Sequence, residues 1–388
     1  MVAVLWVQVF SNASVAHNKR HQNTPYDAEY SKINETDETI GFRGARLSLD
    51  IFPPLLRSSL IERFVNIVRI PKIMKFTSAA FLLGTLLSVS SSAQAVSHWL
   101  YSSEVDKAAQ SLLDRPDIGG VQSLYSWRSL EPRKDHYDFS AIARDVNITA
   151  SKGKQLWIQI QDRSFSIARD PVPDYLHHPI YNNGSVPQCD GDDCEHNFIP
   201  GGWATAQWNP HVRARFQRLL KALASRFDGQ VYGINLPETA IEVQSNNTRT
   251  NFTCQGYFEG ELDNARYAAS VFNHSYAVQY VNFWPCGWNN QNGYLRRSFE
   301  FFAEHGIGVG GPDNIPYKKT MEKNAYPYMS EYRDRVPINV VAVQEPDLAA
   351  INPNTSKPFT KDEFTDFAVN RLGVKIIFWA LSAPWLSQ

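Results

Sequence analysis

The sequence lacks a marked excess of charge and the usual signatures of a bound cofactor. Its 38 Lys and Arg residues and 39 Asp and Glu residues leave a net charge of -1, without the basic excess that phosphate binding requires, so nucleic acid is not expected as a partner. No G-x-G-x-x-G stands between a strand and a helix, and no Cys-x-x-Cys pair or histidine cluster is present. We therefore expect no cofactor and no metal, and the phosphodiesterase class, which would need His and Asp metal ligands, is not supported.

Long apolar runs are also scarce, and the one near the beginning is short. Residues 74–95 have a basic start at Lys75, an apolar centre at 81–89 and small residues ending at 93–95, which is the pattern of a secretory signal peptide. A membrane helix is the alternative, but the apolar run falls short of the roughly 20 residues that a span needs. We expect residues 96–388 to form a secreted or periplasmic protein without stable membrane insertion after cleavage.

The segment that precedes this signal peptide does not resemble a domain. Signal peptides are N-terminal, so we expect translation to start at Met74 and residues 1–73 to come from a misassigned gene start. If these residues are translated, the polar stretch from Lys19 onward is expected to be disordered.

Cysteine is rare, and its placement fits an oxidising compartment. All four cysteines follow the predicted cleavage site: Cys189, Cys194, Cys254 and Cys286. The first two frame the short loop "CDGDDC", which predicts one local disulfide and leaves the other two to pair. Asp190, Asp192 and Asp193 in that loop could hold calcium, but without a full ligand loop a solvated acidic turn is favoured.

From residue 96 onward, strand-like apolar runs alternate with amphipathic helical runs, as in parallel α/β folds. The expected strands are 98–102, 120–126, 154–160, 230–235, 277–283, 306–310, 338–344 and 373–379. The clearest helix is Pro210–Phe227 with Asn209 as its N-cap, and 293–306 and 360–373 each end in glycine.

Eight such strands in roughly 290 residues predict a (β/α)₈ TIM barrel. An open doubly wound sheet is the alternative. The chain ends nine residues after Trp379, so the last helix of the barrel is expected to be missing. Two connections are long, one from about Asp162 to Trp208 after strand three and one after Glu238 at strand four, and long loops over a barrel mouth usually form the walls of a binding cleft.

Active sites of such barrels lie at the C-terminal ends of the strands. The side chains expected there are amides, carboxylates, an arginine and aromatic rings, which suit a carbohydrate with many hydroxyls. As substrate-binding residues we expect Trp127, Arg128, Gln161, Asn235, Tyr280, Trp284, Asp313 and Trp379. Structural roles compete for several of them: Tyr280 and Trp379 could line the barrel, and Asp313 could cap a helix.

Two glutamates stand at opposite points of the predicted ring. Glu238 follows strand four and Glu345 follows strand seven, each next to a proline that ends its strand. Glycoside cleavage needs a protonated carboxylic acid on one side of the bond and an ionised carboxylate on the other. This pair of glutamates therefore predicts catalysis. Glu242, at helical spacing from Glu238, is the competing acid, and Glu131 is expected to brace the barrel, with Arg128 as its partner.

The segment "WRSLEPRKDHYDFS", residues 127–140, resembles the W-x-x-x-E-P-x-x-x-x-Y-D-F segment of barrel glycoside hydrolases in the β-galactosidase and cellulase clan. The resemblance implies Glu238 as acid/base, Glu345 as nucleophile, retention of configuration and Trp379 as the sugar platform. The clan places Asn directly before the acid/base Glu, whereas Leu236 and Pro237 separate Asn235 from Glu238 here. The competing hypothesis is a barrel that binds carbohydrate without cleaving it.

Overall fold

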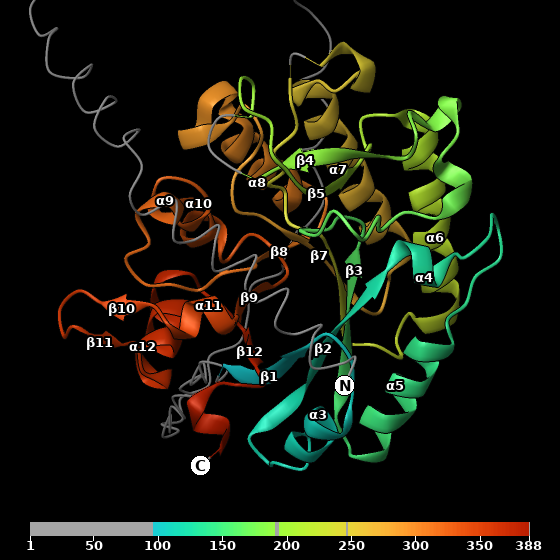
Figure 1. The fold of residues 1–388 in the computed structure, drawn as a ribbon. Helices are drawn as coiled ribbons and strands as arrows, with labels where there is room; N and C mark the ends of the chain where they lie inside the picture. Colours follow the sequence, from blue (N-terminus) through green and yellow to red (C-terminus); the bar gives the residue numbers. More distant parts are fainter. Residues whose placement is uncertain (1–95, 191–193, 246, 388) are drawn as a thin grey trace, which may run out of the picture. The chain divides into compact units, whose positions relative to one another are not determined.

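The computed structural model describes residues 96–190, 194–245 and 247–387, and within them eight parallel strands close into a barrel (Figure 1). The barrel strands are β1 (Ser97–Ser102), β2 (Ile118–Ser126), β3 (Gln155–Gln161), β6 (Gly233–Leu236), β7 (Tyr276–Tyr280), β8 (Gly308–Gly311), β9 (Asn339–Val343) and β12 (Ile376–Ala380). β1 pairs with both β2 and β12, which closes the ring and excludes the open sheet. The predicted barrel and its eight strands are confirmed.

Helices follow most of the strands and surround the barrel (Figure 1). They are α3 (Lys107–Leu112), α4 (Trp127–Leu130), α5 (Ser140–Ser151), α6 (Pro210–Phe227), α7 (Cys254–Val271), α8 (Tyr294–Glu304), α9 (Lys319–Glu322), α10 (Ala325–Tyr332), α11 (Glu345–Leu348) and α12 (Lys361–Asp366), which continues as a π-helical turn over Phe367–Arg371. The side chain of Asn209 caps α6 as predicted, accepting a hydrogen bond of 2.8 Å from the backbone N–H of His211. In the described part of the chain, only the 3₁₀ turn Pro384–Ser387 follows β12.

Large rings fill the barrel interior below its mouth. Trp157 and Tyr280 are fully buried there, and neighbouring strands carry glycine where these rings lie. A Cβ on Gly310 would stand 2.4 Å from the ring of Tyr280, and one on Gly233 would stand 2.6 Å from the ring of Trp157. Side chains of ordinary size at these two positions would force the rings out, so the glycines fix where the floor of the mouth lies.

The long connection after β3 contains structure that the sequence did not reveal. We expected a loop, but β4 (Ser185–Cys189) and β5 (Pro200–Thr205) form an antiparallel hairpin (Figure 1). A second small antiparallel pair, β10 (Ile351–Asn352) and β11 (Lys357–Pro358), follows α11. Alternation of apolar and polar residues is weak in β4 and β5, which contain Pro187, Gly201 and Gly202 and so lack the usual signal of a strand.

Both expected disulfides are present. Cys189 pairs with Cys194, with a Cα–Cα distance of 5.7 Å, and Cys254 pairs with Cys286 at 6.0 Å. The first joins the end of β4 to the acidic loop, and the second joins the start of α7 to the loop after β7.

Several expectations fall on residues that the structure does not describe. The predicted extension 1–73, the signal peptide 74–95 and two aspartates of the acidic loop, Asp192 and Asp193, all lie outside the described residues. Within the described ranges, no group of three or more His, Cys, Asp or Glu side chains is placed to hold a metal ion. No helix in the part of the chain that the structure describes is long and apolar enough to cross a membrane.

Candidate active site

A cavity of about 380 Å³ lies at the C-terminal mouth of the barrel, where the sequence predicted the site. All eight barrel strands, or the residues directly after them, contribute to its lining. One contribution from each is Tyr101, Leu124, Gln161, Glu238, Asn282, Asp313, Glu345 and Leu381. The β4–β5 hairpin adds Gln188, Cys189, Asp190 and Gly201, so the disulfide-closed hairpin forms part of the cavity wall.

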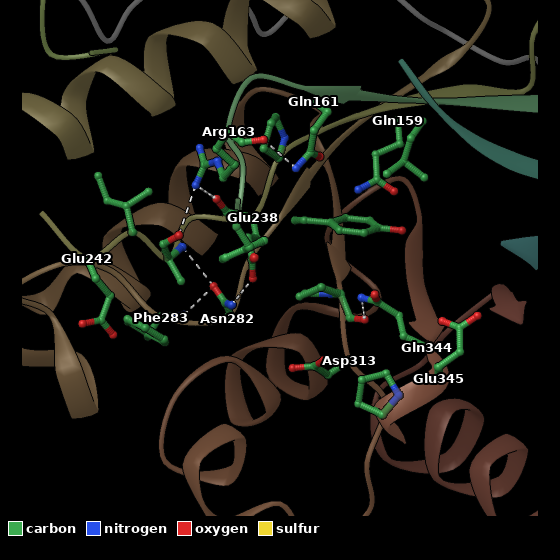
Figure 2. Close-up of a pocket in the computed structure, with 18 of the residues that line it drawn as sticks. Gln159, Gln161, Arg163, Glu238, Glu242, Asn282, Phe283, Asp313, Gln344 and Glu345 are labelled. Carbon is green, nitrogen blue, oxygen red and sulfur yellow. Dashed lines mark hydrogen bonds between the residues drawn. The ribbon is translucent and has the colours of Figure 1, made fainter. Parts of the chain in front are cut away.

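Arg163 fixes the backbone that carries Glu238. Its guanidinium donates to the carbonyl oxygens of Glu238 and Ala240 (Figure 2). The guanidinium is 2% exposed and forms an ion pair with Glu261 at 3.2 Å. Because this buried cation is itself held by α7 and donates to two carbonyl groups, the irregular chain after β6 keeps a defined path.

Asn282 fixes the side chain of Glu238. Its Nδ2 donates a hydrogen bond to Oε2 of Glu238 (Figure 2). Its Oδ1 accepts hydrogen bonds of 3.0 Å from the backbone N–H groups of Ala240 and Phe283. Since both acceptor contacts orient the amide, the NH₂ group must face the carboxylate, and the rotamer of Glu238 is fixed by residues after a neighbouring strand.

The environment of Glu238 favours its protonated form. Burial raises the pKa of Glu238 from 4.5 to about 7, and the negative charge of Asp313 adds to this rise, while Arg163 and the hydrogen bond from Asn282 lower it. Asp313 also lines the cavity and forms an ion pair with Lys318 at 2.9 Å. The cavity therefore holds a carboxyl group that is still partly protonated near neutral pH, together with further carboxylates.

Glu345 lies on the other side of the cavity. It is the first residue of α11, and its neighbour Gln344 is fixed by a capping box with Asp347 and by a 2.7 Å hydrogen bond to the carbonyl of Pro312. In the view of Figure 2 the Glu345 carboxylate is directed away from Glu238. Both glutamates thus line one cavity, but they do not face each other directly.

Tyr101 at the end of β1 lies near both glutamates. Burial raises the pKa of the Tyr101 hydroxyl, and the negative charges of Glu345 and Glu238 raise it further. A neutral hydroxyl can donate a hydrogen bond to a carboxylate or to a sugar hydroxyl. No sequence pattern marked Tyr101, whose signal is its place near the C-terminal end of the first strand.

Three of the residues predicted to bind substrate line the cavity: Gln161, Tyr280 and Asp313. Gln161 donates a 2.9 Å hydrogen bond to the carbonyl of Arg163. The Tyr280 hydroxyl accepts a 2.7 Å hydrogen bond from Gln122, so this ring also belongs to the barrel floor.

The predicted sugar platform, Trp379, does not reach the cavity. Its ring is fully buried on the outer side of β12, where it packs against Phe364 and Trp385, and its Nε1 donates to His98 at 3.0 Å. Side chains alternate along a strand, and here Phe378 points inward, so Trp379 points outward. Leu381 and Ser382 line the cavity after this strand instead.

Four other residues predicted to bind substrate also do not line the cavity. Trp127 is buried with its Nε1 donating to Glu131 at 2.9 Å, and Trp284 is buried with its Nε1 donating to Ser298 at 3.2 Å. Asn235 lies inside the barrel below the cavity, accepting hydrogen bonds from Gln122 and Trp157. Arg128 forms an ion pair with Asp174 away from the cavity.

Two further expectations need correction. Glu131 braces the barrel as expected, but its ion-pair partner is Arg215 of α6 rather than Arg128. Glu242 is not at helical spacing from Glu238, because residues 237–245 form no helix. Glu242 lines the rim of the cavity, where its carbonyl accepts a 2.8 Å hydrogen bond from the N–H of Cys189.

Comparison with known proteins gives distant likenesses in solved structures. No family model matches the chain, and no curated protein matches it. A solved structure of xylanase 10B from Thermotoga petrophila RKU-1 in complex with xylobiose is 10% identical over 74% of this chain and 83% of its own, with a TM-score of 0.44. The glycoside hydrolase of family 10 from Paenibacillus barcinonensis is 13% identical over 74% and 84%, with a TM-score of 0.41. The catalytic domain of the β-amylase from Paenibacillus polymyxa is 12% identical over 73% and 85%, with a TM-score of 0.39.

Proposed function

We propose that this chain is an extracytoplasmic glycoside hydrolase that cleaves O-glycosidic bonds of an oligo- or polysaccharide without a cofactor. The observation that carries the proposal is Glu238: a carboxyl group at the mouth of a (β/α)₈ barrel, fixed by Asn282, whose pKa burial and Asp313 raise to about 7. Such a group can donate a proton at neutral pH, which cleavage of a glycosidic bond requires. The two disulfides support an oxidising compartment.

The roles of the two glutamates follow from the retaining mechanism. Glu238 gives its proton to the glycosidic oxygen as the bond to the leaving sugar breaks, and Glu345 attacks the anomeric carbon to form a covalent glycosyl–enzyme ester. Glu238, now ionised, takes a proton from water, whose oxygen attacks the anomeric carbon and releases Glu345. For this reaction the Glu345 carboxylate has to turn toward Glu238 when substrate binds.

Asp313 is the competing partner carboxylate. It is the acidic residue whose charge most raises the pKa of Glu238, and Lys318 holds it in the same cavity. Glu345→Gln and Asp313→Asn separate the two assignments. We expect Glu345→Gln to abolish turnover of aryl glycosides while leaving folding and sugar binding intact, and Asp313→Asn to keep measurable turnover. The reverse result would give the nucleophile role to Asp313.

One observation favours a second function, a barrel that binds carbohydrate without cleaving it. The Glu345 carboxylate faces away from Glu238 (Figure 2), as expected of a site whose catalytic pair has been lost. A panel of 4-nitrophenyl glycosides, combined with calorimetric titration of soluble oligosaccharides, separates the two functions. Hydrolysis that Glu345→Gln or Asp313→Asn abolishes supports the hydrolase; sugar binding without any hydrolysis supports the binding protein.

A further inference from the structure

Two aromatic rings that no sequence pattern marked line the same cavity as Glu238. Phe283 and Trp288 are both partly exposed, and their ring centroids are 5.3 Å apart at an interplanar angle of 72°. Among the described residues none accepts a hydrogen bond from the Trp288 indole N–H. The pair therefore offers an apolar surface and one available donor to whatever occupies this side of the cavity.

The loop that carries these rings is held at several points. Cys286, between the two rings in sequence, is bonded to Cys254 at the start of α7. Cys286 has a φ of 54°, and Asn289 and Asn290 have φ values of 52° and 61°, a left-handed conformation that asparagine tolerates better than most residues. The Asn292 side chain donates a 2.7 Å hydrogen bond to the carbonyl of Cys286. An exposed aromatic pair on a loop fixed in this way is preorganised for binding.

The same loop is joined to the proposed acid. Phe283 follows Asn282, whose amide donates to Glu238. The hydroxyl of Thr239, which follows Glu238, donates a 2.7 Å hydrogen bond to the carbonyl of Phe283. Phe283 and Glu238 therefore belong to one connected unit, on the side of the cavity away from Glu345 (Figure 2), and the Trp288 ring packs against Phe283.

We propose that Phe283 and Trp288 form a binding site for the leaving-group sugar, a pyranose whose C–H face packs on the rings while a hydroxyl accepts the Trp288 N–H. This rests on the proposed function, because it takes Glu238 as the group that protonates the leaving oxygen. The leaving sugar is attached to that oxygen and must lie beside the acid, in the cavity that Phe283 and Trp288 also line. Packing of apolar C–H groups on an indole stabilises the complex through the burial of both surfaces.

The test compares two substrates that share a glycone and differ in the leaving group. A glycosyl fluoride has no leaving sugar, whereas the matching disaccharide has one. The glycone is taken from the 4-nitrophenyl glycoside that the wild-type chain hydrolyses fastest. Variants are Trp288→Ala, Trp288→Phe and the control Tyr276→Ala, which removes a partly exposed ring at the opposite end of the barrel, at the start of β7.

We expect Trp288→Ala to lower kcat/KM for the disaccharide about tenfold or more and to change that for the fluoride by less than about twofold. Trp288→Phe should recover part of the loss, and Tyr276→Ala should change neither substrate. Equal losses for both substrates, or no loss for either, overturn the proposal.

Failure of the proposed function is a separate result. If the wild-type chain hydrolyses no glycoside, calorimetric titration with gluco-, xylo-, manno- and galacto-oligosaccharides replaces the kinetics. Binding that Trp288→Ala weakens and Tyr276→Ala does not would keep the aromatic sugar site while rejecting the hydrolase. Absence of any sugar binding, or binding insensitive to Trp288→Ala, overturns the site itself.

Discussion

The side-chain amide of Asn282 donates a hydrogen bond to the carboxylate of Glu238, while its oxygen is held by two backbone N–H groups. This hydrogen bond stabilises the ionised carboxylate and opposes burial, which stabilises the protonated one. The two residues follow adjacent barrel strands, β6 and β7, so the protonation of the proposed acid depends on the register between those strands.

Asn282→Ala should therefore raise the pKa of Glu238. In the wild-type chain we expect kcat/KM to fall as pH rises through about 7, because the acid loses its proton there. In the variant this alkaline limb should move up by about one pH unit, with a lower plateau because Glu238 is no longer oriented. The pH profile of kcat/KM checks this, and a limb that stays in place would show that another group controls it.

Glu238→Gln should stabilise the protein in a pH-dependent way. The pKa of Glu238 in the folded state is about 7 against 4.5 for the unfolded group, so the folded state binds more protons between these values and loses stability as pH rises through that interval. Glutamine does not ionise, so the variant should gain about 1–3 kcal/mol over the wild type at about pH 8 and little near the unfolded pKa. Urea unfolding at both pH values measures the difference, and an equal gain at both would refute the burial argument.

Arg163→Met should lower the free energy of unfolding by about 3–5 kcal/mol, because it leaves the Glu261 carboxylate buried without its counter-ion. Burial raises the pKa of Glu261, and the Arg163 guanidinium lowers it. Arg296→Met is the matched control, since its ion pair with Glu331 is exposed and its loss should change stability by less than about 1 kcal/mol. Similar losses in the two variants would mean that burial of the Arg163 pair contributes little.

The two disulfides should differ in their effect on stability. Cys254–Cys286 joins residues 32 apart and Cys189–Cys194 joins residues 5 apart, so loop-closure entropy predicts contributions of about 4 and about 2 kcal/mol. Replacing both cysteines of each pair by alanine, followed by urea unfolding, tests this order. The Cys254–Cys286 disulfide also holds the loop that carries Trp288. Removal of this disulfide should therefore lower kcat/KM for a disaccharide more than for a glycosyl fluoride. A reversed order of stabilities would contradict the loop-closure argument.

The barrel was predictable from the sequence because each parallel strand is a short apolar run followed by an amphipathic helix. The positions of Glu238 and Glu345 followed from the same pattern, since strand ends of a barrel meet at one mouth. The inward or outward direction of a side chain was not predictable. The directions of the Trp379 and Tyr101 side chains depend on strand register, because a shift of one residue exchanges the inner and outer faces of the barrel.

Sequence patterns also did not predict which loop side chains meet at the cavity. Phe283 and Trp288 approach each other only because the loop between them turns through left-handed residues and a disulfide. The β4–β5 hairpin carries proline and glycine in place of an alternating pattern. Neither feature produces periodicity, so neither the aromatic pair nor the hairpin could be predicted, although the length of the connection after β3 did predict a wall of the cleft.

The most direct test of Glu238 as the proton donor is to measure how the activity of the Glu238→Ala variant depends on the leaving group of the substrate. A 2,4-dinitrophenyl glycoside leaves without protonation, whereas a methyl glycoside needs a proton. We predict that the variant retains cleavage of the dinitrophenyl bond and loses cleavage of the methyl bond by about 10²–10⁴-fold. Equal losses for the two leaving groups, or full activity on both, would contradict the account.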